Sequence, residues 1–418
     1  MRTVDRSHDE PDLSSFNFWR LTPRERDVTF SVLRKERPIS WQRPVEDASG
    51  NRDEAGGFWA VTSHRLVREG FAMGEPLLSG QGIFYEDVPE EANIGMSFIA
   101  MDAPRHTLLR RLVSVAFTPK RVAQLEESTR AHARTIMNRM LDEGPGDFVQ
   151  QAAEPLPAEV IADLIGIDGA DARSWFAEKA DDFANWNEPD KLAKYGLDHA
   201  GQVMVQSIVD MRLGFKELAD DRRKHRRRDF VSDLIEARVE GESLSDDEIG
   251  NFLCLMVVAG TDTTKQTISH AMQGMTEFPE SKQALLDDFD STIASGVEEM
   301  IRWSSVGMSF RRTAACDLEF GGQQILEGEK VVLFIISGNR DEAIFEDPWR
   351  FDVRRPNVKQ HIGMAAGPHS CLGAALAKLE LRVLFDELLK RIPQIEAGQP
   401  VYGIGNHIHS IRSMPCHF

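Results

Sequence analysis

The segment His361–Gly373 reads HIGMAAGPHSCLG, and Cys371 stands where a helix is predicted to begin. Glycines lie four residues before and two residues after this cysteine, which lets the chain turn tightly and approach a flat ligand closely. Free amide groups at a helix N-terminus favour a thiolate, and a thiolate is a strong electron donor to iron. The spacing suits an iron–thiolate site, but, taken alone, the segment is explained at least as well by a structural cysteine at a helix start. The predicted helix has one apolar face, formed by Leu372, Ala375, Leu376, Leu379, Val383 and Leu384.

The composition narrows the class of protein. The chain has 418 residues, of which 41% are hydrophobic, so it can bury a large core. Its net charge of −18 disfavours nucleic-acid binding, because phosphate contacts need positive charge. The basic run Arg222–Arg228 is flanked by acidic residues, which is typical of a solvated stretch between helices. The most apolar stretch, Phe252–Ala259, is too short to span a membrane. The four cysteines indicate a reducing cytoplasm rather than a disulfide framework.

Helical periodicity dominates the middle of the chain. Apolar residues recur at spacings of three and four from Thr118 to about Ala294, whereas short strands are predicted at 58–62, 317–320 and 330–336. Residues 1–15 are polar and acidic, with neither a signal peptide nor a membrane anchor, and are expected to be disordered. Residues 16–418 are expected to form one domain, and we predict a monomer.

A second unusual segment, AGTDTT at Ala259–Thr264, lies inside a long apolar helix. Asp and Thr are unfavourable in the middle of a helix, because their side chains compete for backbone hydrogen bonds. The glycine beside them weakens the helix further. Taken alone, the segment is compatible with an ordinary polar patch on a buried helix.

The cysteine segment resembles the haem-binding loop of the cytochromes P450, whose pattern is F-G-x-G-x-H-x-C-x-G. Four positions match, namely Gly367, His369, Cys371 and Gly373. Two positions depart, because Met364 stands where Phe is usual and Ala365 where Gly is usual. The resemblance implies haem b as the cofactor and Cys371 as the axial ligand of its iron. Met is flexible and can fill the space of a Phe, so the departure concerns redox tuning rather than the ligand.

Other segments resemble this family's motifs in the family's order. AGTDTT looks like the distal helix pattern, where the helix opens locally over the oxygen site. That match implies that Thr263 hydrogen-bonds dioxygen and its water, while Asp262 connects the water to solvent and so delivers protons. Met101–Arg110 resembles D-P-P-x-H-x-x-x-R. With two later basic residues, it implies four partners for the haem propionates, namely His106, Arg110, Arg312 and His369.

A structural network behind the haem is implied as well. Glu299 and Arg302 form an E-x-x-R pair, which alone is typical of a surface ion pair on a helix. The segment Pro348–Phe351 follows and resembles the family's P-x-R-F segment. The resemblance therefore implies a network of Glu299, Arg302 and Arg350 that shapes the cysteine loop.

The resemblance runs from about residue 98 to the C-terminus and implies the fold and activity of the family. The fold class is mainly α, a triangular helical domain with small β-sheets around a buried haem. The activity is monooxygenation, in which one atom of O2 enters a substrate and the other becomes water. Electrons are expected from NAD(P)H through a ferredoxin reductase and an acidic ferredoxin. The ferredoxin is expected to dock on a basic patch at the cysteine face, formed by Arg111, Lys120, Arg121, Lys378 and Arg382.

Motif spacing also places a set of mostly apolar side chains over the haem as the substrate pocket. They are Met96, Phe98, Phe183, Trp186, Leu255, Val258, Ala259, Met308, Phe310, His407 and Ile408. The set contains no Arg or Lys, so we expect a bulky, neutral and largely apolar substrate. Weak similarity to relatives that oxidise sterols and branched lipids stands beside a macrolide or other natural product as an equal alternative.

Other function classes fit the same residues less well. Peroxide-driven relatives tend to lack the acid–threonine pair that Asp262 and Thr263 form. Non-catalytic helper relatives often lose the cysteine that Cys371 supplies. A plain redox carrier has no use for an oxygen-handling pair on a buried helix, so it ranks last.

Overall fold

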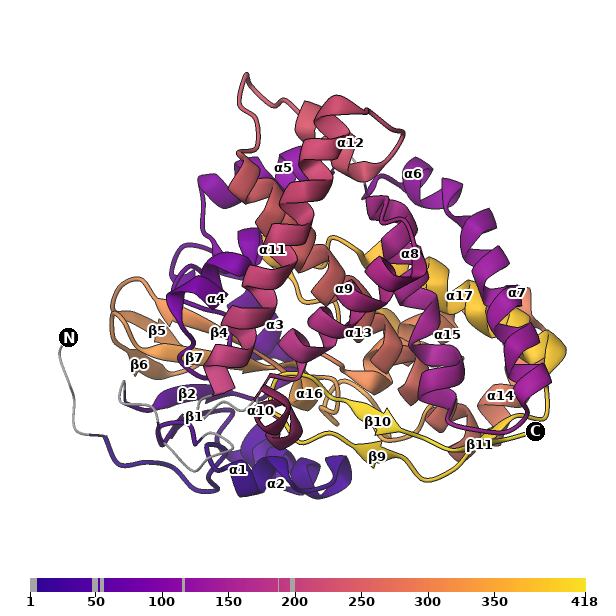
Figure 1. Ribbon diagram of the computed structural model, residues 1–418. Helices are drawn as coiled ribbons and strands as arrows, with labels where there is room; N and C mark the ends of the chain where they lie inside the picture. Colours follow the sequence, from indigo (N-terminus) through magenta and orange to yellow (C-terminus); the bar gives the residue numbers. More distant parts are fainter. Residues whose placement is uncertain (1–5, 47–51, 53–55, 115–116, 187, 196–199) are drawn as a thin grey trace.

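A computed structural model describes residues 6–46, 52, 56–114, 117–186, 188–195 and 200–418. The molecule has a triangular outline, with helices filling most of it and a small sheet near one corner (Figure 1). The predicted class, mainly α with small sheets, is confirmed.

Helices cover most of the chain that the structure describes. The longer ones are α2 (Pro23–Glu36), α3 (His64–Ala72), α5 (Arg105–Ser114), α7 (Glu126–Glu143), α8 (Pro155–Ile165), α9 (Ala170–Ala184), α11 (Ala200–Lys224), α13 (Asp246–Glu277), α14 (Pro279–Asp287), α15 (Phe289–Ser304) and α17 (Ala374–Arg391). The short ones are α1 (Phe16–Trp19), α4 (Glu90–Gly95), α6 (Pro119–Gln124), α10 (Pro189–Tyr195), α12 (Phe230–Glu236), α16 (Ile335–Gly338), the 3-10 turns η1 (Ser97–Ala100), η4 (Val358–Gln360) and η5 (Gly367–His369), and the π-helix η3 (Val149–Ala153).

The central helix α13 organises the others. It begins with a capping box, in which Ser245 accepts from the amide of Glu248 and the Glu248 side chain accepts from the amide of Ser245. Its residues are apolar nearly all round, so it is buried on most sides, and it packs against α8, α9, α11 and α15. Pro279 begins the next helix, α14, immediately after Phe278. The AGTDTT segment therefore lies at the centre of the molecule.

The main sheet has five strands in the order β1-β2-β7-β4-β3. These strands are β1 (Ile39–Gln42), β2 (Phe58–Val61), β3 (Leu77–Leu78), β4 (Ser309–Ala314) and β7 (Lys330–Phe334). Only β2 and β7 pair in parallel in this sheet. Three two-stranded ribbons complete the set, namely β5 (Leu318–Phe320) with β6 (Gln323–Ile325), β9 (Val401–Tyr402) with β10 (Ile411–Ser413), and β8 (Glu396–Ala397) with β11 (Cys416–His417).

The predicted strands at 58–62 and 317–320 are confirmed to within a residue at their ends. The strand predicted at 330–336 ends at Phe334, where the apolar run continues into the turn α16. A short apolar run does not by itself distinguish a strand from a buried helical turn.

The N-terminal segment differs from expectation. Residues 1–5 lie outside the described part, but residues 6–15 pack on the sheet instead of being disordered. The Asp9 amide donates to the Trp41 carbonyl, and the Trp41 amide donates to the Asp9 carboxylate. Leu13 is fully buried. The Arg6 guanidinium lies over the Trp59 ring. These contacts hold residues 6–15 on the sheet although the segment is polar.

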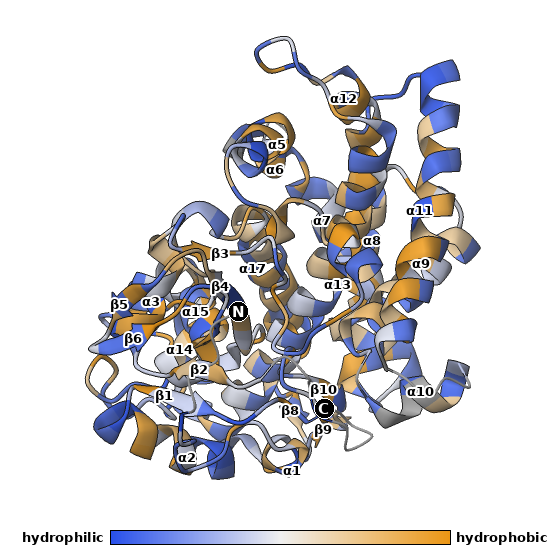
Figure 2. Ribbon diagram, turned by 90° about the vertical axis from the view of Figure 1, so that its left-hand side faces the viewer, coloured by the Kyte–Doolittle hydropathy of each residue, from blue (hydrophilic) through white to orange (hydrophobic). Residues whose placement is uncertain are grey.

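The distribution of hydrophobic residues along the helices agrees with how the helices pack. In Figure 2 the helices alternate between hydrophobic and hydrophilic residues along the ribbon, so that each helix around α13 presents an apolar side to it. Among the described residues, no helix is both long and apolar enough to cross a membrane.

Candidate active site

The cysteine loop is a tight turn that ends at helix α17. The amide of Cys371 donates to the Met364 carbonyl (3.0 Å), and the amide of Ser370 donates to the Gly367 carbonyl (3.1 Å). Cys371 precedes the first residue of α17 by three positions. Burial raises the pKa of the Cys371 thiol, while the Gly373 amide and the Arg110 charge favour the thiolate. Although the residue is deep in the fold, its side chain is accessible, because it faces a cavity.

The glycines and the departure at Ala365 have clear backbone reasons. Gly367 has a φ of +66°, and a Cβ there would lie 2.4 Å from the Phe71 carbonyl oxygen, so only glycine fits. Ala365 has a φ of +53°, a left-handed conformation in which a Cβ is strained. A Cβ on Gly373 would meet nothing within 4 Å, and Gly373 lines the cavity, so this backbone is open to a flat ligand.

The cavity lies between the cysteine loop, α13 and β4. Four of the predicted substrate residues line it, namely Phe98, Leu255, Ala259 and Phe310. Further apolar residues line it that the sequence argument missed, among them Ile99, Ile161, Phe252, Met256 and Val306. Spacings of three and four along α13 group Phe252, Met256 and Ala259 on one face, a signal that the sequence contains.

Seven predicted substrate residues do not line this cavity. Met96 and Val258 are buried in the surrounding core, and Val258 is turned about 100° from Ala259 along the helix. Met308 packs instead beside Phe334 in a separate core near α2, because the chain enters β4 only at Ser309. Ile408 is held in a β-bridge with Gly307. The remaining three, Phe183, Trp186 and His407, form an aromatic cluster behind Phe310.

Four basic side chains predicted to bind the haem propionates lie together. The rings of His106 and His369 are 4.1 Å apart between centroids, and the Arg110 guanidinium donates to the Ser370 carbonyl (2.6 Å). Burial lowers the pKa of Arg312 to about 10. Burial, together with the charges of Arg312, His106 and Arg110, lowers the pKa of His369 to about 3.

This basic cluster has few acidic partners of its own. The Asp102 carboxylate caps the amides of Ser79 and Gly80 and is the acidic group that acts on His106 and Arg312. Two buried ring nitrogens, Nε2 of His106 and Nδ1 of His369, have no hydrogen-bond partner among the described residues. Buried arginines and unpaired polar atoms call for a polar partner of negative charge, and two carboxylates at the edge of a flat ligand supply it. The residues present therefore fit haem.

The acid–threonine pair is split between two environments. Thr263 lines the cavity, and its hydroxyl donates to the Ala259 carbonyl (2.6 Å) within α13. Asp262 is 2% exposed and is bound by the Lys265 ammonium at 2.7 Å. Lys265 also contacts Asp181 of α9 at 2.8 Å, and Asp181 is bound in turn by Lys191 of α10. A chain of ion pairs thus leads from Asp262 toward the lysines of α10.

Charges in this chain fix its protonation. Burial alone would raise the pKa of Asp181, but Lys265 and Lys191 hold it well below its ordinary value. Burial likewise opposes the charge of Lys265, yet Asp262 and Asp181 raise its pKa. The second oxygen of Asp262, Oδ2, is buried without a hydrogen-bond partner among the described residues. That atom can take up a water or a proton.

One acidic residue was missed. Glu380 of α17 lines the cavity, is 1% exposed, and its Oε2 has no hydrogen-bond partner in the described part of the chain. Burial raises the pKa of Glu380 well above its ordinary value and so favours the neutral acid. The sequence contains a signal for this buried acid, because Glu380 stands between Leu379 and Leu381 in the last predicted helix.

The structural network has a different third member than predicted. Glu299 and Arg302 are fully buried, with Arg302 Nε and Glu299 Oε2 at 2.6 Å. The Arg350 side chain lies outside the network and pairs at the surface with Glu280. Arg355 takes its place, with Nε 3.3 Å from Glu299, and it also donates to the Arg350 carbonyl. Phe351 is fully buried, so the side chain of its neighbour Arg350 points to solvent.

The predicted basic patch at the cysteine face is largely neutralised by pairing. Four of its members pair with acids, in the pairs Arg111–Glu240, Arg121–Asp233, Lys378–Glu298 and Arg382–Glu126. Lys120 is exposed. The cysteine face therefore carries paired positive and negative charges rather than a purely positive surface.

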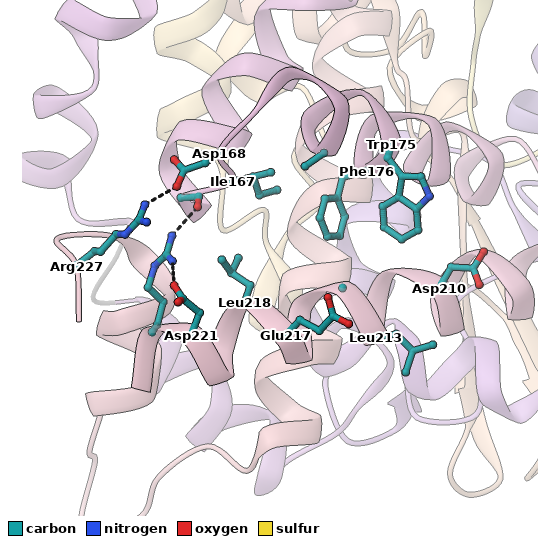
Figure 3. A pocket seen from close by; sticks show the side chains of 14 residues that line it. Ile167, Asp168, Trp175, Phe176, Asp210, Leu213, Glu217, Leu218, Asp221 and Arg227 are labelled. Atoms are coloured by element: carbon teal, nitrogen blue, oxygen red, sulfur yellow. Dashed lines mark hydrogen bonds and ion pairs between the residues drawn. The ribbon is translucent and has the colours of Figure 1, made fainter. Parts of the chain in front are cut away.

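A second hollow lies on the outer surface between α9 and α11 (Figure 3). Trp175, Phe176 and Leu213 line it, and its arginines are occupied, since Arg227 pairs with Asp168 and Arg222 donates to the Gly166 carbonyl. Cys371 and the basic cluster belong to the internal cavity, which is therefore the candidate active site.

The fold, the cysteine loop and the basic cluster define a haem-thiolate protein. Residues 193–392 match the family model "Cytochrome P450". The chain is 37% identical over 413 residues to a methyl-branched lipid omega-hydroxylase of Mycobacterium tuberculosis, covering 97% of this chain and 94% of that one. It is 35% identical over 381 residues to a steroid C26-monooxygenase of Rhodococcus jostii, covering 89% and 77% respectively.

A solved structure agrees with these relatives. Cytochrome P450 CYP268A2 of Mycobacterium marinum, in complex with pseudoionone, superimposes with a TM-score of 0.94 at 44% identity over the full length of both chains. The chain belongs to the cytochrome P450 family and is a monooxygenase with haem b as the family's cofactor.

Proposed function

We propose that the protein oxidises a bulky, neutral and largely apolar substrate of terpenoid, steroid, branched-lipid or polyketide type. The observation that carries this proposal is the wall of the cavity. Its two arginines, Arg110 and Arg312, belong to the basic cluster that fits the haem propionates. The lining from η1 and from the first half of α13 is apolar, and α13 adds the hydroxyls of Thr263, Thr264 and Thr267. A pocket of this composition favours apolar surface and offers no cation to an anionic head group.

Each part of the site has a role in this proposal. Cys371 would supply the thiolate to the haem iron, and His106, Arg110, Arg312 and His369 would hold the propionates. Haem, when bound, activates dioxygen for transfer of one oxygen atom. The protein's own residues orient the substrate, exclude water and deliver protons.

Proton delivery is assigned to the pair on α13. The Thr263 hydroxyl faces the cavity, and it holds a water or proton there if its bond to the Ala259 carbonyl opens. Asp262 lies one residue earlier. Lys265 contacts its Oδ1, and its Oδ2 has no hydrogen-bond partner among the residues that the structure describes. Such a carboxylate can pass protons from the ion-pair chain toward the cavity. Electrons are proposed to come from NAD(P)H through ferredoxin reductase and ferredoxin.

A spectroscopic screen tests the substrate class. Purified holoenzyme is titrated with terpenoids, sterols, methyl-branched lipids, macrolides and amino acids, and the low-to-high-spin shift of the Soret band is recorded. We expect saturable shifts with at least one neutral apolar class. A tight shift with a small charged amino acid, and none with the apolar classes, would overturn the proposal.

A turnover assay then distinguishes electrons from NAD(P)H from oxidation driven by hydrogen peroxide. With a bound apolar compound, product should form with NAD(P)H, ferredoxin reductase and ferredoxin. Product formed only with added hydrogen peroxide would identify a peroxygenase instead.

A further inference from the structure

A carboxylate on α15 joins the two ends of the cysteine loop. One oxygen of Glu298 accepts a hydrogen bond from Nε2 of His361 at 3.0 Å, and its other oxygen meets Nζ of Lys378 at 2.7 Å. His361 begins the segment that leads to Cys371, and Lys378 lies near the start of α17, the helix that follows. Glu298 therefore links the chain before the cysteine to the helix after it.

Both contacts of Glu298 lead directly to the wall of the internal cavity. Nδ1 of His361 accepts from the Gly363 amide at 3.1 Å, and Gly363 lines the cavity. On the other side, Ala377 lines the cavity and is the neighbour of Lys378 in the chain. Glu298 is thus held within one or two residues of the cavity wall on each side of the loop.

Glu298 carries a charge that has to be balanced. Its side chain is 16% exposed. The hydrogen bond from His361 and the charge of Lys378 lower the pKa of Glu298 to about 2, although burial opposes this. Because Nδ1 of His361 accepts a hydrogen bond, the ring hydrogen is on Nε2 and the ring is neutral. The negative charge of Glu298 is therefore left to balance the positive charge of Lys378.

Lys378 is one of the cations that act on the cysteine sulfur. Burial raises the pKa of the Cys371 thiol, and the charged side chains that oppose this are Arg110 and Lys378. Arg110 belongs to the basic cluster that fits the propionates, whereas Lys378 is paired with Glu298. The reduction potential of haem iron depends on its axial ligand and on the groups around that ligand. Glu298 therefore decides how much of the charge of Lys378 reaches the sulfur.

We propose that Glu298 is a positioning residue for the haem thiolate, which acts through Lys378 and sets the reduction potential of the iron. By cancelling the charge of Lys378, it keeps electron density on the sulfur of Cys371, and that density favours cleavage of the O–O bond. This inference is independent of the substrate class, and it rests on the proposed ligation of the haem iron by Cys371.

Two charge-removing substitutions with opposite expected signs test the inference in the holoenzyme. Titration with dithionite measures the equilibrium in which one electron converts ferric to ferrous haem. Glu298→Gln leaves the charge of Lys378 uncancelled, and a nearby cation favours the added electron. The equilibrium constant for reduction should rise about threefold to tenfold, which is about 28–59 mV for one electron. The factor is modest because Lys378 is 37% exposed and water screens its charge.

Lys378→Gln leaves the carboxylate of Glu298 uncancelled, so it should lower the same equilibrium constant by a similar factor. The double variant, which carries both substitutions, should return close to the wild-type value. A loosened cysteine loop would instead move both single variants in the same direction. The opposite signs therefore distinguish cancellation of charge from a merely structural role.

Arg382 supplies the matched control. It lies four residues after Lys378 on the same helix, its side chain is 36% exposed, and it pairs with Glu126 at 2.7 Å. Because Arg382 is one helical turn farther from the cysteine, Arg382→Gln should leave the reduction potential unchanged.

Shifts of the same sign in the two single variants, or shifts no larger than that of Arg382→Gln, would overturn the inference. Those results would leave the proposed function standing, since substrate spin shifts and the reduced-CO band are measured separately. A wild-type protein without the red-shifted reduced-CO band would overturn both the ligation by Cys371 and the role of Glu298. If Glu298→Gln binds no haem, Lys378→Gln decides alone, because an unchanged or higher equilibrium constant overturns the inference and a lower one supports it.

Discussion

Arg355 and Arg350 are five residues apart, yet the structure predicts opposite consequences for their removal. Arg355 is nearly buried, touches Glu299 and donates to the carbonyls of Glu346, Asp347 and Arg350. Arg355→Ala leaves these acceptors in the interior, and breaking a buried ion pair costs about 3–5 kcal/mol. The Arg350 side chain is 50% exposed, and in the described part of the chain its ion pair is with Glu280. Arg350→Ala should cost less than about 1 kcal/mol.

Both variants are compared with wild-type holoenzyme by urea titration, following the reduced-CO Soret band and far-ultraviolet circular dichroism. The midpoint should fall steeply for Arg355→Ala, and the yield of haem-loaded protein should fall with it, because Glu299 and Arg302 anchor the segment that precedes the cysteine loop. Arg355→Lys should recover only part of the loss, since an ammonium cannot reach the same four acceptors. Equal losses for the two alanine variants, or a greater loss for Arg350→Ala, would refute this assignment.

Four further substitutions test three other parts of the molecule. Ala365→Gly relieves a left-handed alanine and should raise stability by about 0.5–1 kcal/mol in the same urea titration, and an unchanged midpoint would argue against the strain. Thr263→Ala should retain haem and substrate binding but release peroxide at the expense of product. Asp262→Asn should slow turnover about tenfold to a hundredfold. An unaltered ratio of product formed to NAD(P)H consumed in Thr263→Ala would remove Thr263 from proton delivery. Asp163, mainly through its hydrogen bond, raises the pKa of His132, with Glu159 and Arg173 also nearby. The His132–Asp163 pair therefore stabilises the folded state fully below pH about 6.5, the unfolded pKa of histidine. This stabilisation is lost as the pH rises through the raised pKa of His132. His132→Gln should destabilise more at pH 6 than at pH 9, and the reverse order would contradict the pair.

The parts of the site that depend on local sequence could be predicted. Cys371 and Gly367 lie in one contiguous segment, so the resemblance to the haem-binding loop is carried by local spacing, and apolar periodicity predicts the helix that follows. Thr263 was likewise implied by the resemblance of the local segment AGTDTT, and Leu255 by motif spacing along the same helix. The pair Glu299–Arg302 was equally local, at a spacing of three residues.

Parts that depend on packing between distant segments could not be predicted. Lys265 lies three residues after Asp262, but its second partner, Asp181, comes from α9, more than 80 residues earlier. Arg355 and Arg350 are equally plausible in sequence, and only the path of the chain after Trp349 decides which turns inward. Met308 was placed over the haem by motif spacing, but β4 begins one residue later and Met308 packs in a separate core.

The central claim, that Cys371 is the thiolate ligand in a haem cavity, is tested most directly by the reduced-CO difference spectrum. Wild-type protein should give the strongly red-shifted Soret band of thiolate-ligated haem, and Cys371→Ala should lose it while Cys254→Ala keeps it. Burial raises the pKa of Cys254 to a value far above neutrality, so its thiol stays protonated in the core. Retention of the red-shifted band in Cys371→Ala would contradict the assignment.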